Sequence, residues 1–428
     1  MSTAAPSLFV GIDVGTSGVR AVAIDGDRQV VAQGAARMDS FSEDHRSPDA
    51  WRTALQAALA ALFGSVDPAA VGALAVDGTS GTMLPVDGAG TPLAQPMMYN
   101  DPVDDPAVIA AIAAVAPPES AALGSNSALG RAIVLQAAPG TVRIIHQADW
   151  IAGQLSGRFD VSDENNALKT GYDPVARQWP DWIAKTGMAA AMLPSVVEPG
   201  TVTGRAGGAL ARQLGLHPET LIVAGTTDGC ASFLATGASE PGDGVTALGT
   251  TLTIKLFSDT PVFAPQFGIY SHRLAGGWLA GGASNTGGNV LAAYFDSETI
   301  ARLSAAIDPE TDTGLDYYPL ARPGERFPVS DPDFAPRMEP RPADDTLFLK
   351  AILEGIAAIE AMAYRKLVEL GAPALASIRT VGGGASNTAW ARMRERGLGV
   401  PARSVTSLDA AYGTALLALQ GATPEIAA

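Results

Sequence analysis

The amino-acid sequence predicts an α/β protein of two domains, and two observations carry this prediction. A chain of 428 residues is too long for one hydrophobic core, because single cores stop growing at about 250–300 residues. A unit of strand, glycine-containing turn and strand occurs at 8–24 and again at 245–255, and segments with the apolar spacing of helices follow each unit. Because the unit recurs in both halves, we expect two domains of similar build.

Composition and charge exclude several classes of protein. Apolar residues make up 47% of the chain and charged residues 17%, which is typical of a globular protein. The net charge of −16 argues against nucleic acid or an anionic membrane as a partner, because both require a basic surface. An anionic nucleotide bound by backbone dipoles remains compatible with this charge. Cys230 is the only cysteine, which excludes an intrachain disulfide and a cysteine-based metal site.

The sequence also predicts a cytoplasmic location. The first residues lack the basic region of a secretory signal, and a strand is expected by about Leu8. The longest apolar run, 107–116, lies between two prolines and is too short to cross a bilayer.

The stretch FVGIDVGTSGVRAVAID at 9–25 combines a carboxylate with a glycine turn. We expect a strand that ends at Asp13, a turn at 15–18 and a second strand from Val19. Backbone N–H groups in such a turn form a nest for phosphate oxygens. A carboxylate beside bare phosphate would be repelled, so Asp13 indicates Mg²⁺ between them. The alternative is an ordinary β-hairpin with a solvated aspartate.

Two further polar turns follow buried-type strands. The strand at 71–76 leads into Asp-Gly-Thr-Ser-Gly-Thr at 77–82, and the strand at 221–225 leads into Thr-Thr-Asp-Gly at 226–229. Residues 87–172 are irregular in pattern, and their polar island at 162–166 is expected to be a solvated loop, with ligand contact as the alternative.

Helices are expected where apolar residues recur at helical spacing. The last of them carries Gly413, which we expect to permit close helix packing rather than chemistry. The expected helices are 48–63, 230–236, 349–367, 388–396 and 409–419.

Five glycine-containing motifs occur in a fixed order along the chain. They are GIDVGTSGVRA, GTTDG, GTTLTIKL, GGASNTGG, and VGGGASNTAWARM with AAYGTALLAL. The ordered set resembles the FGGY family of carbohydrate kinases, within the actin-like ATPase superfamily, over essentially the whole chain. The segments VDGTSGTMLPVD, QADWIAGQLSG and NNALKTGYDP resemble the short ribulokinase-type members of cyanobacteria and plants. Tyr-Asn-Asp-Pro at 99–102 departs from glycerol and xylulose kinases, whose Trp-x-Asp-x-Arg sugar segment is missing here.

The resemblance implies a two-domain actin-like ATPase (ribonuclease H-like) fold with an interdomain cleft. Residues 1–235 plus 410–428 would form the sugar-binding domain, and 236–409 the ATP-binding domain. The implied activity is ATP-dependent phosphorylation of a terminal hydroxyl of a ketopentose, with D-ribulose giving the 5-phosphate. A xylulose or other polyol kinase is the alternative. ATP, Mg²⁺ and a small sugar are the expected ligands, and the protein is expected to be a monomer or homodimer.

The resemblance also assigns roles to residues. Asp228 would be the general base for the sugar hydroxyl, with a plain helix N-cap as the alternative. Asp13 would organise Mg²⁺, and Asp77 and Ser80 would contact the sugar together with Asp13 and Asp228. Lys169 is a weaker sugar candidate. The expected phosphate and nucleotide contacts are Gly15, Thr16, Ser17, Gly249, Thr250, Thr251, Gly282, Asn285, Gly383, Gly384 and Asn387, for which tight turns are the alternative. Trp51, Trp150 and His146 are expected to be core or surface residues.

A rival interpretation comes from another class of protein. A non-catalytic actin-like module, such as a chaperone-type nucleotide switch or a filament subunit, needs a nucleotide site but no sugar base. Asp228 and the polar turn at 77–82 favour the kinase. ATP turnover that is independent of any sugar would support the switch.

Overall fold

The computed structural model describes residues 8–423 and divides them into two compact units. The first unit contains residues 8–235, 272–274 and 407–423, and the second contains 236–271 and 275–406. The sequence-based boundaries differ in two places, since the return to the first unit begins at Ser407 and the short strand at 272–274 joins the first unit. No turn signal in the sequence marks either position.

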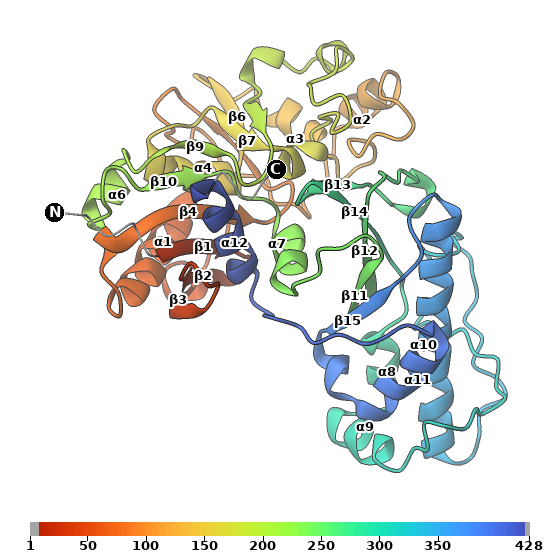
Figure 1. Cartoon of the computed structure of the whole chain (residues 1–428). Helices are drawn as coiled ribbons and strands as arrows, with labels where there is room; N and C mark the ends of the chain where they lie inside the picture. The colour runs from red at the N-terminus through yellow and green to blue at the C-terminus, as the bar shows by residue number, and fades with distance from the viewer. Residues whose placement is uncertain (1–7, 424–428) are drawn as a thin grey trace. The chain divides into compact units, whose positions relative to one another are not determined.

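A six-stranded sheet forms the centre of the first unit, in the order β3-β2-β1-β4-β10-β9 (Figure 1). The first three strands are antiparallel neighbours, whereas β1, β4 and β10 run parallel to one another. The strands are β1 (Leu8–Val14), β2 (Gly18–Ile24), β3 (Val30–Arg37), β4 (Val71–Gly78), β9 (Val202–Arg205) and β10 (Leu221–Val223).

Helices cover both faces of this sheet, which explains why β1 and β4 are buried along their whole length. Val10 and Ile12 pack with the helices α1 (Pro48–Phe63), α4 (Gln147–Ser156) and α6 (Ala209–Gln213), whereas Phe9 packs with α12 (Ala410–Ala422). Trp51, Trp150 and His146, which were expected to be core or surface residues, lie in the interior, with exposed fractions of 0%, 3% and 1%.

The last helix, α12, lies unusually close to its neighbours. A Cβ atom added at Gly11 of β1 would lie 2.0 Å from the carbonyl oxygen of Ala411. One added at Gly413 would lie 2.0 Å from the carbonyl oxygen of Ala231 on α7 (Asp228–Ala235). The packing role predicted for Gly413 is therefore confirmed.

The polar island at 162–166 is buried, so the prediction of a solvated loop was wrong. It ends strand β7 (Val161–Asp163) and forms helix α5 (Glu164–Leu168). Two of its side chains have partners from other segments: Arg177 pairs with Glu164, and Asn165 donates to the Thr226 hydroxyl at 2.9 Å. These partners lie beyond the reach of local sequence patterns.

Shorter elements complete the first unit. They are α2 (Pro106–Ala113), α3 (Ala128–Leu135), β5 (Met83–Val86), β6 (Arg143–His146), β8 (Ser195–Val197) and β13 (His272–Leu274). The pair β5–β6 is antiparallel and the pair β7–β8 is parallel. Among residues 8–423, no helix is both long and apolar enough to span a membrane.

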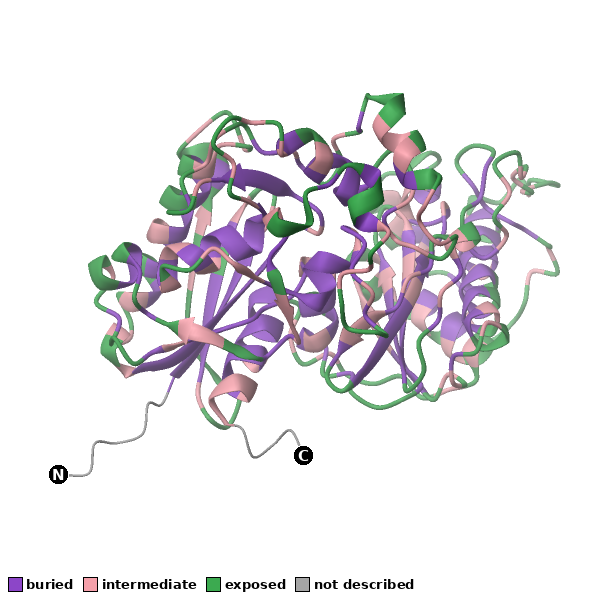
Figure 2. Ribbon diagram, turned by 90° about the horizontal axis from the view of Figure 1, so that it is seen from above, coloured by how far each residue is buried: buried purple, intermediate pink, exposed green. Residues whose placement is uncertain are grey.

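The second unit is built on strands in the order β14-β12-β11-β15, and most residues of β11 and β12 are buried (Figure 2). The helix predicted at 349–367 is α10 (Asp345–Glu369), and its buried Glu360 forms an ion pair with Arg394 at 2.6 Å. The other elements are β11 (Asp243–Leu248), β12 (Leu252–Ser258), β14 (Gly277–Ala283), β15 (Ser377–Val381), α8 (Gly288–Ala292), α9 (Ser297–Ser304) and α11 (Thr388–Leu398).

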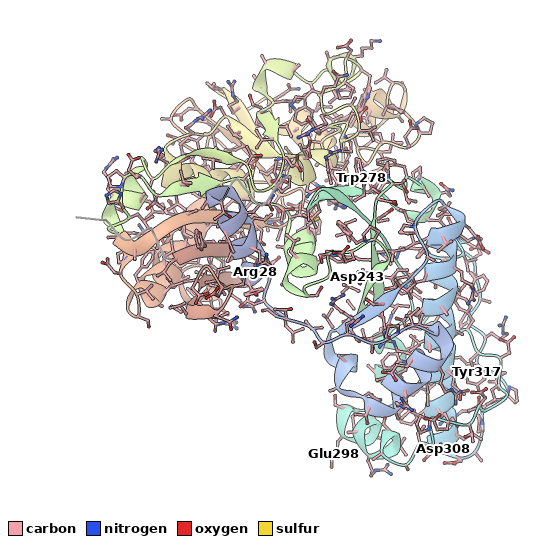
Figure 3. The ribbon with its side chains drawn as sticks, in the orientation of Figure 1. Arg28, Asp243, Trp278, Glu298, Asp308 and Tyr317 are labelled. Atoms are coloured by element: carbon pink, nitrogen blue, oxygen red, sulfur yellow. The ribbon has the colours of Figure 1, made fainter. Side chains whose placement is uncertain are left out.

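Residues 311–344 of the second unit contain no helix or strand, as the proline- and aspartate-rich sequence predicts. Their conformation is fixed by side chains such as Tyr317, whose hydroxyl donates to the carbonyl of Pro340 at 2.6 Å (Figure 3). Glu325 is buried in this segment and accepts from the hydroxyl groups of Ser284 and Tyr318.

Candidate active site

Three aspartates lie at the carboxyl ends of the parallel strands of the first unit. Asp13 of β1 and Asp77 of β4 are paired in register, and Asp228 follows β10 as the first residue of α7. A Cβ added at Gly225 would lie 1.8 Å from the carbonyl oxygen of Val76, so glycine is needed for β10 to approach β4. Ligands of α/β sheets bind at this end of the strands, and these three aspartates are the ones predicted to contact the sugar acceptor.

The Asp13 and Asp77 carboxyl groups are coupled to each other. Burial raises the pKa of Asp13 to about 6, while its hydrogen bond with Asp77 lowers it and the charge of Asp228 raises it. Burial also raises the pKa of Asp77 well above its usual range. Oδ2 of Asp77 accepts from the Thr414 hydroxyl. Oδ1 of Asp77 has no hydrogen-bond partner among the described residues. Burial and the neighbouring Asp13 charge therefore favour the neutral form of Asp77.

This arrangement changes the role expected for Asp77. Its side chain has no exposed surface, because β4 is covered on both faces and Thr414 of α12 closes the carboxyl end. Asp77 therefore supports Asp13 from within the sheet, and the structure does not present it to a sugar.

Asp228, the predicted general base, is the first residue of α7. It is half-buried, and the N–H of Gly229 donates to its Oδ1 at 2.7 Å. The N-terminus of the eight-residue α7 favours the ionised carboxylate. Burial lowers the pKa of Lys169, and the Asp228 charge opposes this shift, so Lys169 lies on the same side of the first unit.

The turn at 79–82 is held by a network that sequence reasoning missed. Oε1 of Gln147 accepts from the backbone N–H and hydroxyl of Thr79, at 3.2 and 2.8 Å. Arg131 donates to the carbonyl of Gly81 at 3.0 Å. Oγ of Ser80 is shielded and has no hydrogen-bond partner among the described residues. An arginine inside the otherwise apolar segment ALGRAIVL was the one signal that could have revealed Arg131.

The opening turn has the form of a β-hairpin turn. The N–H of Gly15 donates to the carbonyl of Gly18 at 3.0 Å, and Thr16 and Ser17 are exposed. The nearest atom to a Cβ added at Gly15 would be 3.6 Å away, so the turn leaves room on that side. Phosphate binding by Gly15, Thr16 and Ser17 stays a prediction.

The second unit contains a cavity of about 890 Å³. Its wall includes five of the predicted nucleotide contacts. Apolar side chains such as Phe295 and Ile300 of α9 and its surroundings also line it. The predicted residues that line it are Gly249, Thr250, Gly383, Gly384 and Asn387. A Cβ added at Gly384 would lie 2.7 Å from the Trp390 ring, so this glycine allows close packing under the cavity.

Other predicted nucleotide contacts do not line this cavity. Gly282 packs against the Phe327 ring, 2.6 Å from an added Cβ, and Asn285 donates to the carbonyl of Gly324 at 2.9 Å. Thr251 is also absent from the wall. Asn387, which does line it, already accepts from the Trp390 N–H and donates to Ser304. Gly282 thus permits close packing, Asn285 is held by hydrogen bonds and Asn387 caps α11, while nucleotide contact by these residues stays a prediction.

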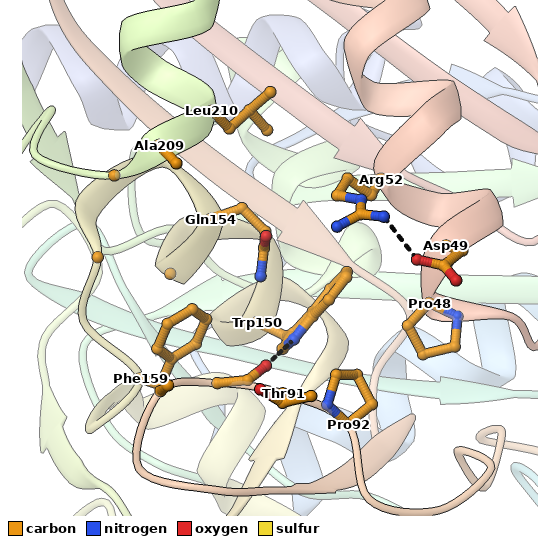
Figure 4. A pocket seen from close by; sticks show the side chains of 15 residues that line it. Pro48, Asp49, Arg52, Thr91, Pro92, Trp150, Gln154, Phe159, Ala209 and Leu210 are labelled. Carbon is orange, nitrogen blue, oxygen red and sulfur yellow. Dashed lines mark hydrogen bonds and ion pairs between the residues drawn. The ribbon is translucent and has the colours of Figure 1, made fainter.

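A separate cavity of about 650 Å³ lies in the first unit (Figure 4). Trp150 donates to the carbonyl of Gly90 at 2.9 Å on its wall, and Arg52 pairs with Asp49 at 2.7 Å. None of the predicted site residues lines it.

The donor set around Asp13 limits how a metal ion could be held. Within residues 8–423, no group of three or more His, Cys, Asp or Glu side chains is placed to hold a metal ion. Mg²⁺ in nucleotide enzymes commonly takes one or two carboxylates and completes its shell with phosphates and water. Asp13 fits that pattern as a single protein ligand.

Comparisons with known proteins agree with this description. Residues 244–422 match the C-terminal domain of the FGGY family of carbohydrate kinases. The xylulose kinase of Streptomyces coelicolor is 27% identical over 96% of this chain and 88% of its own length.

Solved structures show the fold. The xylulose kinase of Bifidobacterium adolescentis superposes with a TM-score of 0.80 at 21% identity, covering 97% of this chain and 93% of that one. The gluconate kinase of Lactobacillus acidophilus superposes with a TM-score of 0.81 at 18% identity, covering 97% of this chain and 89% of that one.

The prediction of the two-domain actin-like ATPase fold is confirmed. The family prediction is supported over residues 244–422, which match the C-terminal domain of the FGGY carbohydrate kinases, and the curated relative named above is a carbohydrate kinase. The ribulokinase-type subgroup receives no support from these relatives.

Proposed function

We propose that this protein is an ATP-dependent carbohydrate kinase that phosphorylates a terminal hydroxyl of a ketopentose. The observation that carries the proposal is the grouping of Asp13, Asp77 and Asp228 at one end of the parallel strands. A nucleotide switch needs a carboxylate near phosphate, but it has no use for a second one at a helix N-terminus beside a polar turn.

Asp228 is assigned the role of general base. A sugar hydroxyl is a poor nucleophile, and a carboxylate within hydrogen-bond reach orients it and accepts its proton during transfer. The backbone N–H of Gly229 donates to Oδ1 of Asp228 and helps to orient the carboxylate for this role.

Asp13 is assigned to the metal side of the reaction. Bound Mg²⁺ supplies neutralisation of the charge that develops on the phosphate oxygens. The charge of Arg20, whose Nη1 lies 3.8 Å from Oδ2 of Asp13, lowers the pKa of Asp13 and so favours its carboxylate form.

The cavity of the second unit is assigned to ATP. Its volume of about 890 Å³ lies in the range of small-molecule sites, and its mixture of apolar wall and backbone-rich glycine turns suits a nucleoside. Gly249 and Thr250 form the turn between β11 and β12, where backbone N–H groups suit phosphate oxygens.

D-Xylulose is the leading acceptor, because the full-length curated relative and several structural neighbours are xylulose kinases. D-Ribulose, predicted from the sequence, is the second candidate. The observation that favours it is the segment 99–102, Tyr-Asn-Asp-Pro, which lacks the arginine of the xylulose-kinase segment.

A coupled assay of ADP release tests the function. The panel contains D-xylulose, D-ribulose, xylitol, ribitol, glycerol and gluconate, with a reaction lacking sugar as the control. We expect turnover to depend on a sugar, with the highest kcat/KM for a ketopentose and D-xylulose ahead of D-ribulose. Turnover that no sugar stimulates would contradict the proposal and support a nucleotide switch. A clear lead for D-ribulose would reverse only the choice of ketopentose.

A further inference from the structure

We propose that Arg131 is a positioning residue of the acceptor site, an inference that rests on the proposed kinase function. Arg131 lies on α3, and only 1% of it is exposed. Its Nε donates to the carbonyl of Gly81 and its Nη1 to the carbonyl of Asp101, both at 3.0 Å. One guanidinium thus cross-links the turn at 79–82 to the loop at 99–102.

The two segments that Arg131 joins also contact each other. The backbone N–H of Tyr99 donates to Oγ1 of Thr82 at 3.1 Å, and Thr82 lies 2.6 Å from the Thr79 hydroxyl. Tyr99 is 43% exposed and lies on the outer side of the loop at 99–102. The buried Arg131 supports this loop from the interior. Loss of Arg131 would release both carbonyls at once.

Gly81 shows how closely the guanidinium fits. Its φ of +89° lies in the left-handed region, and an added Cβ would lie 2.8 Å from Nη2 of Arg131. The turn conformation and the arginine position are therefore fixed together.

The charge of Arg131 has no close carboxylate partner. The Asp101 carboxylate forms its bidentate ion pair with Arg46, at 2.5 and 2.8 Å, while Arg131 takes only the Asp101 carbonyl. Burial lowers the pKa of Arg131 to about 10, and the Asp101 charge opposes this shift. Burying a guanidinium on neutral acceptors is costly, so a packing role alone explains it poorly.

The charge lies between the two segments that we propose to form the acceptor site, the turn at 79–82 and the loop at 99–102. Arg131 is among the charges that act on Lys169, and Lys169 in turn interacts with Asp228. The two cations therefore accompany the predicted base, and they suit an acceptor rich in oxygen atoms. The segment 99–102 contains no arginine, and α3 supplies one to it from 30 residues further along the chain.

Steady-state kinetics of Arg131→Lys and Arg131→Met test this role. Lysine keeps the charge but loses the planar fork that reaches two carbonyls, so we expect an intermediate effect. The KM for the ketopentose should rise about 10-fold for Arg131→Lys and up to about 100-fold for Arg131→Met. The KM for ATP should change less than about 2-fold, because the proposed ATP contacts lie in the second unit.

Arg143→Met is the matched control. Arg143 also donates to two backbone carbonyls of the first unit, those of Val142 and Ala191, at 3.2 and 2.9 Å, but it is remote in sequence from both acceptor segments. Both KM values should stay at wild-type levels in this variant. An equal rise of the sugar KM in Arg143→Met would overturn the assignment.

Three results separate the possibilities. An unchanged sugar KM in folded Arg131→Lys, or an equal shift of the sugar and ATP KM values, would overturn the positioning role. If Arg131→Met does not fold, Gly81→Ala is the second test. This variant keeps Arg131, but the added methyl group displaces its Nη2. The KM of Gly81→Ala for the sugar should also rise. A wild-type protein that phosphorylates no sugar would contradict the proposed function instead.

Discussion

The hydroxyl of Thr414 donates a hydrogen bond to Oδ2 of Asp77, across 337 positions of the sequence. Both side chains are fully buried. Thr414 belongs to α12, so the last helix of the described chain takes part in placing the Asp13–Asp77 pair. The acid cluster is therefore completed only when the C-terminal segment has packed on the sheet.

Replacing Thr414 by valine tests this dependence. Valine keeps the shape of threonine but leaves Oδ2 of Asp77 without its donor, and an unsatisfied buried acceptor costs about 1–3 kcal/mol. Chemical denaturation should show this loss of free energy of unfolding, together with a lower kcat. Thr423→Val is the control, because that hydroxyl bonds only to the carbonyl of Leu419 near the end of α12. Equal stability of Thr414→Val and wild type would contradict this account.

Replacing Gly413 by alanine tests the close packing of α12 on α7. The added methyl group would meet backbone atoms of Ala231 and Ala235, at 2.0 and 2.9 Å, and backbone cannot move aside cheaply. Overpacking of this kind costs about 1–3 kcal/mol or more, so the melting temperature should fall.

Gly397→Ala is the control for Gly413→Ala, and its melting temperature should rise instead of falling. Gly397 lies in α11, and nothing stands within 4 Å of an added Cβ. Alanine there should stabilise the protein by about 0.5–1 kcal/mol. A melting temperature that falls equally in both variants would show that close packing is not the cause.

Asp163 should make stability depend on pH. Burial, and secondarily the Asp149 charge, raise the pKa of Asp163 to about 7 from 3.8. A carboxyl group with a raised folded-state pKa contributes stability that is present below about pH 4 and is lost as pH rises through 7. Asp163→Asn removes this loss while it keeps an acceptor for the N–H groups of Asn165 and Asn166.

The measurement for Asp163 is urea denaturation of wild type and Asp163→Asn at pH 5 and pH 8. Relative to wild type the variant should gain roughly 1–4 kcal/mol of stability between pH 5 and pH 8, because the unfolded carboxyl group ionises from about pH 4 and the folded one only near pH 7. A difference that is the same at both pH values would contradict the raised pKa.

The sequence was sufficient for the elements whose signals are local. Apolar periodicity and capping residues located α1, α10 and the strands β1 and β4 within a few residues, because these elements pack through continuous apolar faces. The positions of Asp13 and Asp228 at strand ends could be read from the same patterns.

Long-range pairing could not be read from the sequence. The island at 162–166 is polar in composition, yet it is buried, and Arg177 and Thr226 supply partners to Glu164 and Asn165. Asp77 looked like a ligand contact because nothing in its neighbourhood reveals Thr414. Arg131, Gln147 and the apolar wall of the second-unit cavity were missed for the same reason: their partners are distant in sequence.

Steady-state kinetics of Asp228→Asn test the central claim most directly. Asparagine keeps the shape and can still accept from the N–H of Gly229, but it loses the negative charge and the basicity. The fold should survive, as a thermal melt would show, and the KM for ATP should stay near its wild-type value. Because loss of a general base costs about 10²–10⁴ in rate, kcat with the preferred ketopentose should fall by that factor. Near-normal turnover in a folded Asp228→Asn protein would contradict the account.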